Sequence, residues 1–280
     1  MPTAAGMFSS QYPATIARSL LAMAAGCLFA WLSLPALADE SIVDVSAGGA
    51  PRHAEFLGRA APDSVHHMAD WVVDAKNNAG LPFAIIDKPD AKAFVFDKDG
   101  KLVGSAWVLV GLAPGDDSVP GIGTMPLTDI TPDIRTTPAG RFVASMGHDL
   151  KSDVLWVDYA DAISLHRVIN TNPAERRLER IVSDNPAEHR ISYGCINVPA
   201  KFFDGVVKPA FKDGRGVVYI LPEVKAMRDV FPNYYDVDAP RQAPNATGGA
   251  LIQAAYPAAA PEEREPSALV ARPGKVAAQQ

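Results

Sequence analysis

Residues 83–110, FAIIDKPDAKAFVFDKDGKLVGSAWVLV, decide the fold class, because three short apolar runs alternate here with turn sequences. The runs at 83–87, 93–97 and 102–110 are rich in the β-branched and aromatic residues that strands favour. Lys88-Pro-Asp90 and Asp97-Lys-Asp-Gly100 separate them, and Pro, Asp and Gly in such positions are typical of tight turns. The stretch therefore predicts a β-meander.

Further along the chain, β-rich runs outnumber helical patterns. We expect strands at 140–145, 155–159, 162–168 and 216–221, and helices at 63–78, 174–181 and 200–207. Asp63 is the expected cap of the first helix, and Gly80 follows its end. Because long strand–helix alternation is absent from the sequence, a doubly wound sheet is disfavoured. The pattern predicts one mainly β domain with a few helices, over residues 81–222.

The flanks of this domain differ from it in composition. Residues 39–80 are expected to form a flexible leader followed by the first helix, because 39–62 lack periodicity. Residues 223–280 are expected to hold a short helix and then an Ala- and Pro-rich disordered tail. Such a composition buries too little apolar area to offset the entropy of ordering.

The N-terminus predicts export. Arg18 precedes an apolar stretch at 20–34, and Pro35 and Ala36-Leu-Ala38 follow it. This order is typical of a secretory signal peptide, here residues 1–38, cleaved after Ala38. An uncleaved membrane anchor and lipidation at Cys27 are the alternatives. The sequence thus predicts a periplasmic or cell-envelope protein.

Composition excludes some partners. The chain of 280 residues carries a formal charge of −6 and has no basic run, so it lacks the electrostatic features of a nucleic-acid-binding protein. Its His, Asp and Cys residues show no zinc-ligand spacing, so no metal site is expected. The adjacent His66 and His67 would point about 100° apart on a helix, and we interpret them as surface residues.

Cysteine usage points to one residue. The chain has two cysteines, and removal of the signal peptide takes Cys27 away. Cys195 then stands alone in an oxidising compartment, where cysteines usually pair. It is either a buried inert thiol or a nucleophile.

The segment around Cys195 favours the nucleophile. In Ile191-Ser-Tyr-Gly-Cys-Ile-Asn-Val-Pro199, Gly194 lets a ligand approach the backbone. The N–H groups of residues 193–195 are candidates for an oxyanion hole, where one donor contributes about 3–4 kcal/mol. A thiol near its ordinary pKa is mostly protonated at neutral pH, so it needs a nearby base.

Three ordered features resemble one family. Ser192-Tyr-Gly-Cys-Ile-Asn197, the upstream His166, and Thr137-Pro-Ala-Gly-Arg-Phe142 after the β-meander are together similar to the L,D-transpeptidases with a YkuD-type catalytic domain. The resemblance covers residues 81–222 and implies a β-sandwich catalytic domain. A papain-type protease is disfavoured, because its cysteine precedes its histidine.

The resemblance implies acyl transfer on the peptide stems of peptidoglycan. Cys195 would attack the carbonyl before the terminal D-alanine, and His166 would accept the thiol proton. D-Alanine would leave, and an amine of a second stem would resolve the thioester as a 3→3 cross-link. Neither a metal nor an organic cofactor takes part in this chemistry.

The same resemblance suggests supporting roles. Ser192, Tyr193, Gly194 and Asn197 would shape the cysteine loop and its oxyanion hole, and Ser192 and Asn197 would act through hydrogen bonds. His148 and Arg190 are candidates for substrate binding, against a plain surface role. His189, six residues before Cys195, is the rival base.

The chain departs from the family pattern in three places. Tyr193 stands where relatives often have histidine, and Arg167-Val168 follows His166, so no side chain is assigned to orient that imidazole. The 29 positions from His166 to Cys195 are more than the family usually has. The extra residues at 170–190 are expected to form a helical lid. Its four arginines either bind stem carboxylates or lie on a solvated face: Arg176, Arg177, Arg180 and Arg190.

Three other functions stay open. Water in place of the acceptor amine would give an L,D-carboxypeptidase, and a lysine acceptor would attach stems to an envelope protein. A different class is a wall-binding module whose site is catalytically silent. Carbapenem acylation of Cys195 would distinguish an active site from that module.

Overall fold

The computed structural model describes residues 50–149 and 152–239. The expected signal peptide, with Ala38 and Cys27, and the expected tail from 240 onward lie outside these ranges. None of the helices in the described ranges has both the length and the apolar character needed to cross a membrane.

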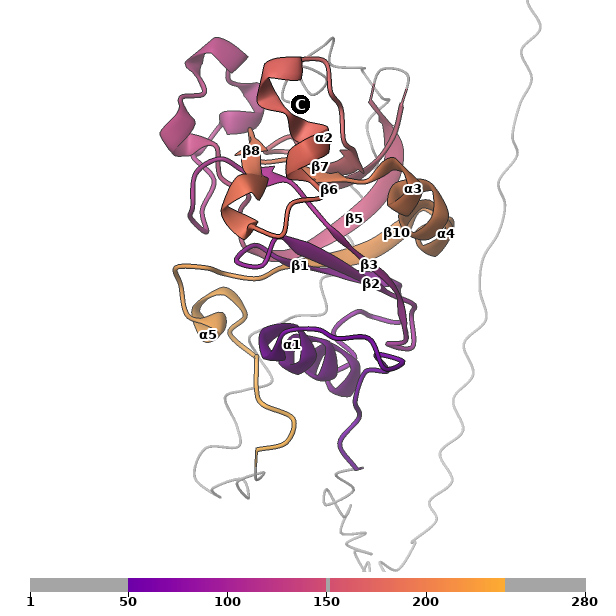
Figure 1. Cartoon of the computed structure of the whole chain (residues 1–280). Coiled ribbons are helices and arrows are strands. Elements are labelled where there is room, and N and C mark those ends of the chain that lie inside the picture. Colours follow the sequence, from indigo (N-terminus) through magenta and orange to yellow (C-terminus); the bar gives the residue numbers. More distant parts are fainter. Residues whose placement is uncertain (1–49, 150–151, 240–280) are drawn as a thin grey trace, which may run out of the picture. The chain divides into compact units, whose positions relative to one another are not determined.

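The predicted meander is confirmed. Strands β1 (Phe83–Asp87), β2 (Lys92–Phe96) and β3 (Leu102–Trp107) pair antiparallel in sequence order. They form one end of an eight-stranded sheet of order β3-β2-β1-β10-β5-β6-β7-β9 (Figure 1). The remaining strands of this sheet are β5 (Gly140–Asp149), β6 (Ser152–Asp158), β7 (Ile163–Arg167), β9 (Ile196–Val198) and β10 (Arg215–Ile220).

This sheet is mixed and nearly closed. β1 pairs with β10, and β7 with β9, in parallel, whereas the other neighbours are antiparallel. Just after β3, Leu109 exchanges two backbone hydrogen bonds with Asn197 of β9, at 2.8 and 2.9 Å. The chain after one edge strand thereby reaches the opposite edge, which gives the sheet its barrel-like form. The expectation of a mainly β protein with a few short helices is confirmed.

The expected strand at 102–110 is interrupted. Its last part forms β4 (Val110–Gly111), which pairs in parallel with β8 (Arg190–Ser192) in a separate two-stranded sheet. The interruption has a physical cause, since Leu109 must leave β2 to bond to Asn197. β4 and β8 therefore lie beside the strand that follows Cys195.

Strand alternation divides the apolar side chains between two cores. Ala84 and Ile86 of β1 face a core inside the curved sheet, shared with β6, β7, β9 and the helices after 200. Phe83 and Ile85 face the other way, onto a core covered by α1 (Asp63–Asp74). In Figure 1, α1 lies against one side of the sheet, and α2 lies beyond the opposite side.

The packed unit extends beyond residues 81–222 at both ends. Phe56 is buried and packs edge-on against Phe96 at 5.4 Å, and Glu55 forms a bridge with Lys101. Phe231 and Val237 also join the core under α1. The part of the expected flexible leader from Ala54 onward is thus packed against the sheet. Phe56 is its apolar anchor, and the short segment around it has no periodicity that would predict this packing.

Most helical segments differ in detail from the predictions. α1 begins at Asp63, with Pro62 and not Asp63 at the cap position, and ends at Asp74, before Lys76 adopts a φ of 51°. The predicted helix at 174–181 is broken at Arg176, whose φ is 52°. It consists of the 3-10 turn η4 (Pro173–Glu175) and the short α2 (Arg177–Arg180).

The helix predicted at 200–207 continues to 210. It consists of α3 (Ala200–Phe202), the π-helical η6 (Phe203–Val207) and α4 (Lys208–Ala210). The short helix expected after 222 is α5 (Met227–Val230). Four further 3-10 turns complete the described elements: η1 (Ile122–Thr124), η2 (Leu127–Asp129), η3 (Pro132–Ile134) and η5 (Pro186–His189).

Candidate active site

The two predicted catalytic residues lie on β7 and at the entry to β9, which are neighbouring strands. His166 is the Cα partner of Asn197 across this parallel pair, and Cys195 directly precedes β9. Ile163 and Leu165 of β7 point into the inner core, so the alternating Ser164 and His166 point away from it. The Oγ of Ser164 lies 3.7 Å from the Sγ of Cys195. The fold therefore places Cys195 beside Ser164, two positions before His166 on the same strand, although 29 positions separate Cys195 from His166 in the sequence.

Cys195 is a buried thiol, with 1% of its surface exposed. Its Sγ donates to the carbonyl of Ala162 at 3.5 Å. Burial raises the pKa of the Cys195 thiol, while hydrogen bonds from Ser164 and the charge of Arg177 act in the opposite direction. In this state the sulfur is a neutral thiol.

His166 is held by a backbone carbonyl. Its Nδ1 lies 2.7 Å from the carbonyl oxygen of Arg167. Because a carbonyl only accepts, Nδ1 carries the proton and Nε2 keeps its lone pair. Nε2 is buried without a hydrogen-bond partner among the described residues, so it makes no bond to Cys195 in this state. Burial lowers the pKa of His166 to about 4, which keeps the ring neutral.

The loop before Cys195 is fixed by Ser192 and Gly194. The Oγ of Ser192 donates to the carbonyl of Cys195 at 2.7 Å and accepts the N–H of Gly194 at 3.1 Å. Gly194 has a φ of 131°, and a Cβ there would lie 2.8 Å from the carbonyl oxygen of Thr136. The glycine is therefore required by both backbone conformation and close packing.

The Thr137-Pro-Ala-Gly-Arg-Phe142 segment contributes directly to this loop. The Oγ1 of Thr137 donates to the carbonyl of Gly194 at 2.7 Å and accepts the N–H of Gly111 at 2.8 Å. The backbone carbonyl of Thr137 accepts a hydrogen bond from Lys88 at 3.0 Å. This threonine joins the cysteine loop to β4 and to a buried lysine.

Lys88 is the residue that sequence reasoning missed. The sequence places it in a turn and gives no sign of its environment. Its Nζ is completely buried, bonds to Asp116 at 2.7 Å and lies 3.4 Å from Glu223. Burial acts to raise the pKa of Asp116, but the bond from Lys88 and three backbone N–H groups lower it to about 2. Nothing in the sequence signals this network, because its members are far apart along the chain.

Asn197 and Arg177 form the other side of the site. The Nδ2 of Asn197 donates to the carbonyl of Cys195 at 3.3 Å, and its Oδ1 accepts from Nη1 of Arg177 at 3.0 Å. Arg177 is 1% exposed, and its Nη2 is buried without a partner in the described parts of the chain. Leaving such a donor unpaired costs about 1–3 kcal/mol. Of the two sequence interpretations, the solvated face does not hold for this arginine.

The other candidate residues lie in ordinary contacts. Arg176 is exposed and pairs with Glu179, and Arg180 donates to the carbonyls of Glu175 and Glu188. The remaining three candidates are engaged as follows: Arg190 pairs with Glu223, the exposed His148 pairs with Asp153 at 2.9 Å, and the ring of Tyr193 lies 3.8 Å from the guanidinium of Arg135.

The rival histidine is structural. His189 is completely buried, and its Nδ1 and Nε2 lie 2.8 and 2.9 Å from the carbonyls of Val108 and Ser183. With both ring nitrogens facing carbonyls, it has no free nitrogen to accept a thiol proton. Its hydrogen bonds fasten the 170–190 segment to the chain beside β4.

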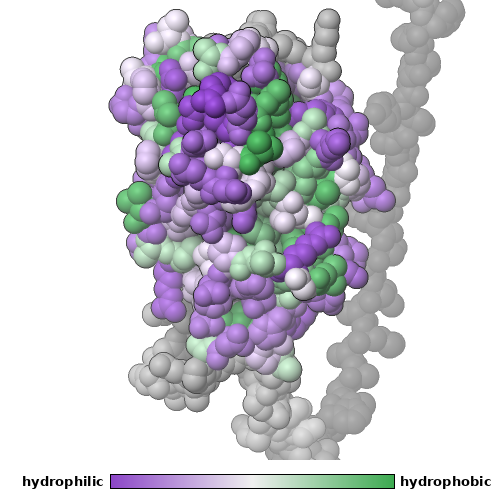
Figure 2. All heavy atoms as spheres, in the orientation of Figure 1, coloured by the Kyte–Doolittle hydropathy of each residue, from purple (hydrophilic) through white to green (hydrophobic). Residues whose placement is uncertain are grey.

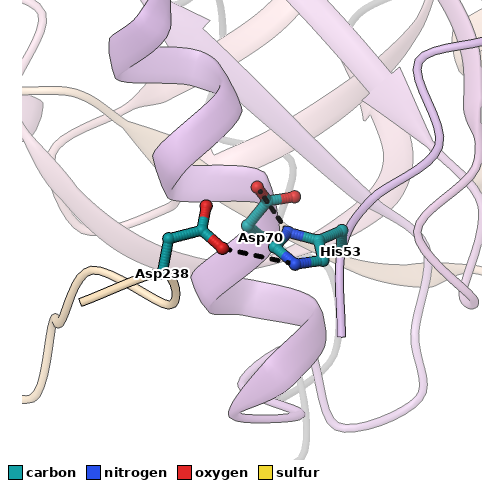
Figure 3. Close-up of side chains that lie close together, drawn as sticks. All are labelled: His53, Asp70 and Asp238. Carbon is teal, nitrogen blue, oxygen red and sulfur yellow. Dashed lines mark hydrogen bonds and ion pairs between the residues drawn. The ribbon is translucent and has the colours of Figure 1, made fainter. Parts of the chain in front are cut away.

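Figure 3 shows a second cluster, on the surface, that the sequence does not predict. His53 places Nδ1 3.1 Å from Asp70 of α1 and Nε2 3.6 Å from Asp238. The hydrogen bond to Asp70 raises the pKa of His53, and the charges of Asp70, Asp238 and Asp74 add to it, whereas burial acts against it. In the described ranges these three side chains are the one group close enough for a metal ion. Because the two ring nitrogens face different carboxylates, the arrangement is that of an imidazolium between two acids.

Comparison with known proteins adds no identification. No protein-family model matches the chain, and no curated protein matches it. The functional conclusion therefore depends on the residues of the site and their geometry.

Proposed function

We propose that this chain is a cysteine acyltransferase of the L,D-transpeptidase type, acting on peptidoglycan stem peptides. One observation carries the proposal. The Nδ1–H of His166 is fixed by the carbonyl of Arg167, which leaves a buried, unpaired Nε2 on β7, the strand beside Cys195. A neutral imidazole with a free lone pair is what a thiol needs to lose its proton.

The reaction proceeds in two halves. His166 takes the thiol proton as the sulfur of Cys195 bonds to the carbonyl carbon before the terminal D-alanine. The bond from that carbon to the D-alanine nitrogen breaks, and the leaving amine takes the proton from His166. The acceptor amine then gives a proton to His166 and bonds to the same carbon. The thioester breaks, and Cys195 regains its proton.

The oxyanion needs backbone donors near Cys195. The N–H of Gly194 already donates to Ser192, so it is engaged inside the loop. The N–H groups of Tyr193 and Cys195 remain as the proposed donors, each contributing about 3–4 kcal/mol to the transition state.

The site is closed in this structure, because Cys195 and His166 are 1% and 2% exposed. We propose that the segment 170–190, which contains α2 and η5, moves to admit the substrate. Figure 2 shows a mainly hydrophilic face with separate apolar patches. In this segment Leu178 and Val182 are 53% and 70% exposed, whereas Arg177, Ile181 and His189 are buried. The movement would therefore have to break the contacts of these three residues.

The proposal also includes what the resemblance implies about the domain, its export and the product. These are an L,D-transpeptidase-like sandwich domain, export by a cleaved signal peptide, and 3→3 cross-linking with release of D-alanine. L,D-carboxypeptidase activity and attachment of stems to a protein lysine share the same acyl-enzyme and differ in the acceptor. The acceptor therefore has to be identified from products.

The test is intact-mass analysis of the mature protein after incubation with a disaccharide-tetrapeptide. We expect a thioester adduct, free D-alanine and a cross-linked dimer, none of which should form with Cys195→Ala. His166→Gln should slow acylation by about 10²–10⁴-fold, because it removes the base. The exposed His67→Gln is the matched control and should behave as the wild type.

The products separate the remaining possibilities. D-Alanine without a dimer would indicate a carboxypeptidase, and an adduct on a lysine-containing protein would indicate attachment. Identical behaviour of wild type and Cys195→Ala would contradict acyl transfer. The silent wall-binding module would then be favoured, since Cys195 is buried and its thiol bonds to Ala162 and not to His166.

A further inference from the structure

Arg177 presents an unsatisfied cationic group beside the nucleophile. Its Nε bonds to Glu175 and its Nη1 bonds to Asn197, but Nη2 is buried without a partner in the described chain. The side chain is 1% exposed, so water does not satisfy this group from outside. The Nη2 group of Arg177 therefore needs a hydrogen-bond acceptor that the described residues do not provide.

The location of the guanidinium is set by Asn197. The same amide that accepts from Arg177 donates to the carbonyl of Cys195, and Asn197 is the Cα partner of His166. The positive charge of Arg177 also acts on both residues, as the smallest of the named influences. Burial raises the pKa of Cys195, as Asp149 does, and Arg177 lowers it. Burial lowers the pKa of His166, and Arg177 adds to that effect. Arg177 is therefore close to the place where the acyl donor must lie.

The chemistry of the free group selects an anion. Glu175 is 26% exposed and engages Nε, and Asn197 engages Nη1, so Nη2 is the nitrogen of this guanidinium left without a partner among the described residues. A guanidinium N–H binds a carboxylate more strongly than a neutral acceptor, because the hydrogen bond is charge-assisted. In an acyl donor that ends in an amino acid, the terminal carboxylate is one residue from the carbonyl that Cys195 attacks.

We propose that Nη2 of Arg177 binds the terminal carboxylate of the acyl donor, so that the enzyme selects peptides whose leaving residue has a free carboxylate. This inference rests on the proposed function and identifies which of the four arginines of the 170–190 segment recognises the donor. Arg177 would touch the substrate and determine specificity, whereas Cys195 and His166 would carry out the bond changes.

The experiment compares two donors that differ only at the last group. One tetrapeptide ends in D-alanine and the other in D-alaninamide, and kcat/KM for acylation of Cys195 is measured with both. We expect wild type to prefer the carboxylate by roughly 100-fold, the loss typical of an unpaired buried charge. Arg177→Gln should lose roughly 100-fold on the carboxylate donor and little on the carboxamide, which removes the preference.

Two further variants control for structure and charge. Arg176→Gln is the matched control, since Arg176 adjoins the same helix but is exposed, and it should keep the wild-type preference. Arg177→Lys retains the charge and should keep part of the preference.

The outcomes are separable. If neither donor acylates wild-type Cys195, the proposed function itself fails. If both donors acylate wild type equally well, acyl transfer stands and carboxylate recognition is overturned, whether or not Arg177→Gln folds. Equal slowing of both donors by Arg177→Gln would also overturn it, because a purely structural role predicts that result.

Discussion

Thr137 and Gly194 are joined by a 2.7 Å hydrogen bond from the threonine Oγ1 to the glycine carbonyl. The two residues are 57 positions apart, and the second directly precedes Cys195. The bond is buried, so it competes with no solvent. The orientation of the loop that carries Cys195 thus depends on a side chain from a segment far away in the sequence.

Replacing this hydroxyl should affect both stability and acylation. Thr137→Val removes the donor to Gly194 and leaves the N–H of Gly111 without its acceptor. We expect a loss of about 1–3 kcal/mol in the free energy of unfolding and slower acylation of Cys195. Urea unfolding and intact-mass kinetics measure the two effects. The neighbouring Thr136→Val is the isosteric control, and an equal loss in both variants would contradict the role of this bond.

Gly194 should not tolerate a side chain. Gly194→Ala would place a Cβ 2.8 Å from the Thr136 carbonyl oxygen at a φ of 131°. We expect a destabilisation of about 1–3 kcal/mol or more from strain and overpacking, together with loss of acylation. Gly205→Ala is the control, since a Cβ there would meet nothing within 4 Å. A Gly194→Ala protein with wild-type melting temperature and activity would show that the loop is more permissive than its geometry indicates.

The buried imidazole should make stability depend on pH. The pKa of His166 falls from 6.5 to about 4 on folding, so the unfolded chain binds the proton more readily between these values. The contribution of the neutral His166 to the free energy of unfolding is complete above pH 6.5. It should fall by about 3 kcal/mol as the pH drops to about 4. Chemical denaturation from pH 4 to pH 8 measures this slope.

His166→Gln is the control for that measurement, because glutamine does not titrate. The difference between the two pH profiles isolates His166 from His53, whose raised pKa acts in the opposite direction. Parallel profiles for wild type and His166→Gln would indicate that the imidazole is solvated in solution.

The buried lysine should be essential for folding. Lys88→Met leaves Asp116 and Glu223 near one another without their cation, and removing one partner of a buried ion pair typically costs about 3–5 kcal/mol. Urea unfolding measures the loss, and adding Asp116→Asn should recover part of it. Lys98→Met is the control, because the Lys98–Asp99 pair is exposed and should contribute nothing measurable. A Lys88→Met midpoint equal to wild type would exclude the network as a source of stability.

The parts of the fold that depend on local pattern were predictable. The meander and the strands predicted at 140–145 and 216–221 have apolar runs that mark them locally. The structure contains them as the meander, Gly140–Asp149 and Arg215–Ile220. The break at Arg176 was not predictable, because a left-handed arginine has no local signal. The same holds for the separation of β4 from β3, which results from a hydrogen bond to Asn197 far along the chain.

The candidate site also has a part that the sequence predicts and a part that it does not. The motif around Cys195 identified the nucleophile candidate and its loop, but not the group that orients His166, because that group is a backbone carbonyl. Burial of Arg177 and Lys88 was also hidden. Arginine and lysine usually lie on the surface, and their buried partners come from distant segments.

The parallel pairing of β7 with β9 determines which positions near Cys195 can be substituted. Successive residues of a strand face opposite sides, so a slip of one position would turn the sulfur of Cys195 into the apolar interior. The connection between the two strands is constrained mainly where it is buried, at Arg177 and His189. Its exposed positions, such as Leu178 and Val182, can be replaced without separating the thiol from the imidazole. Recognition of new substrates can therefore be explored in that connection while the reacting atoms keep their places.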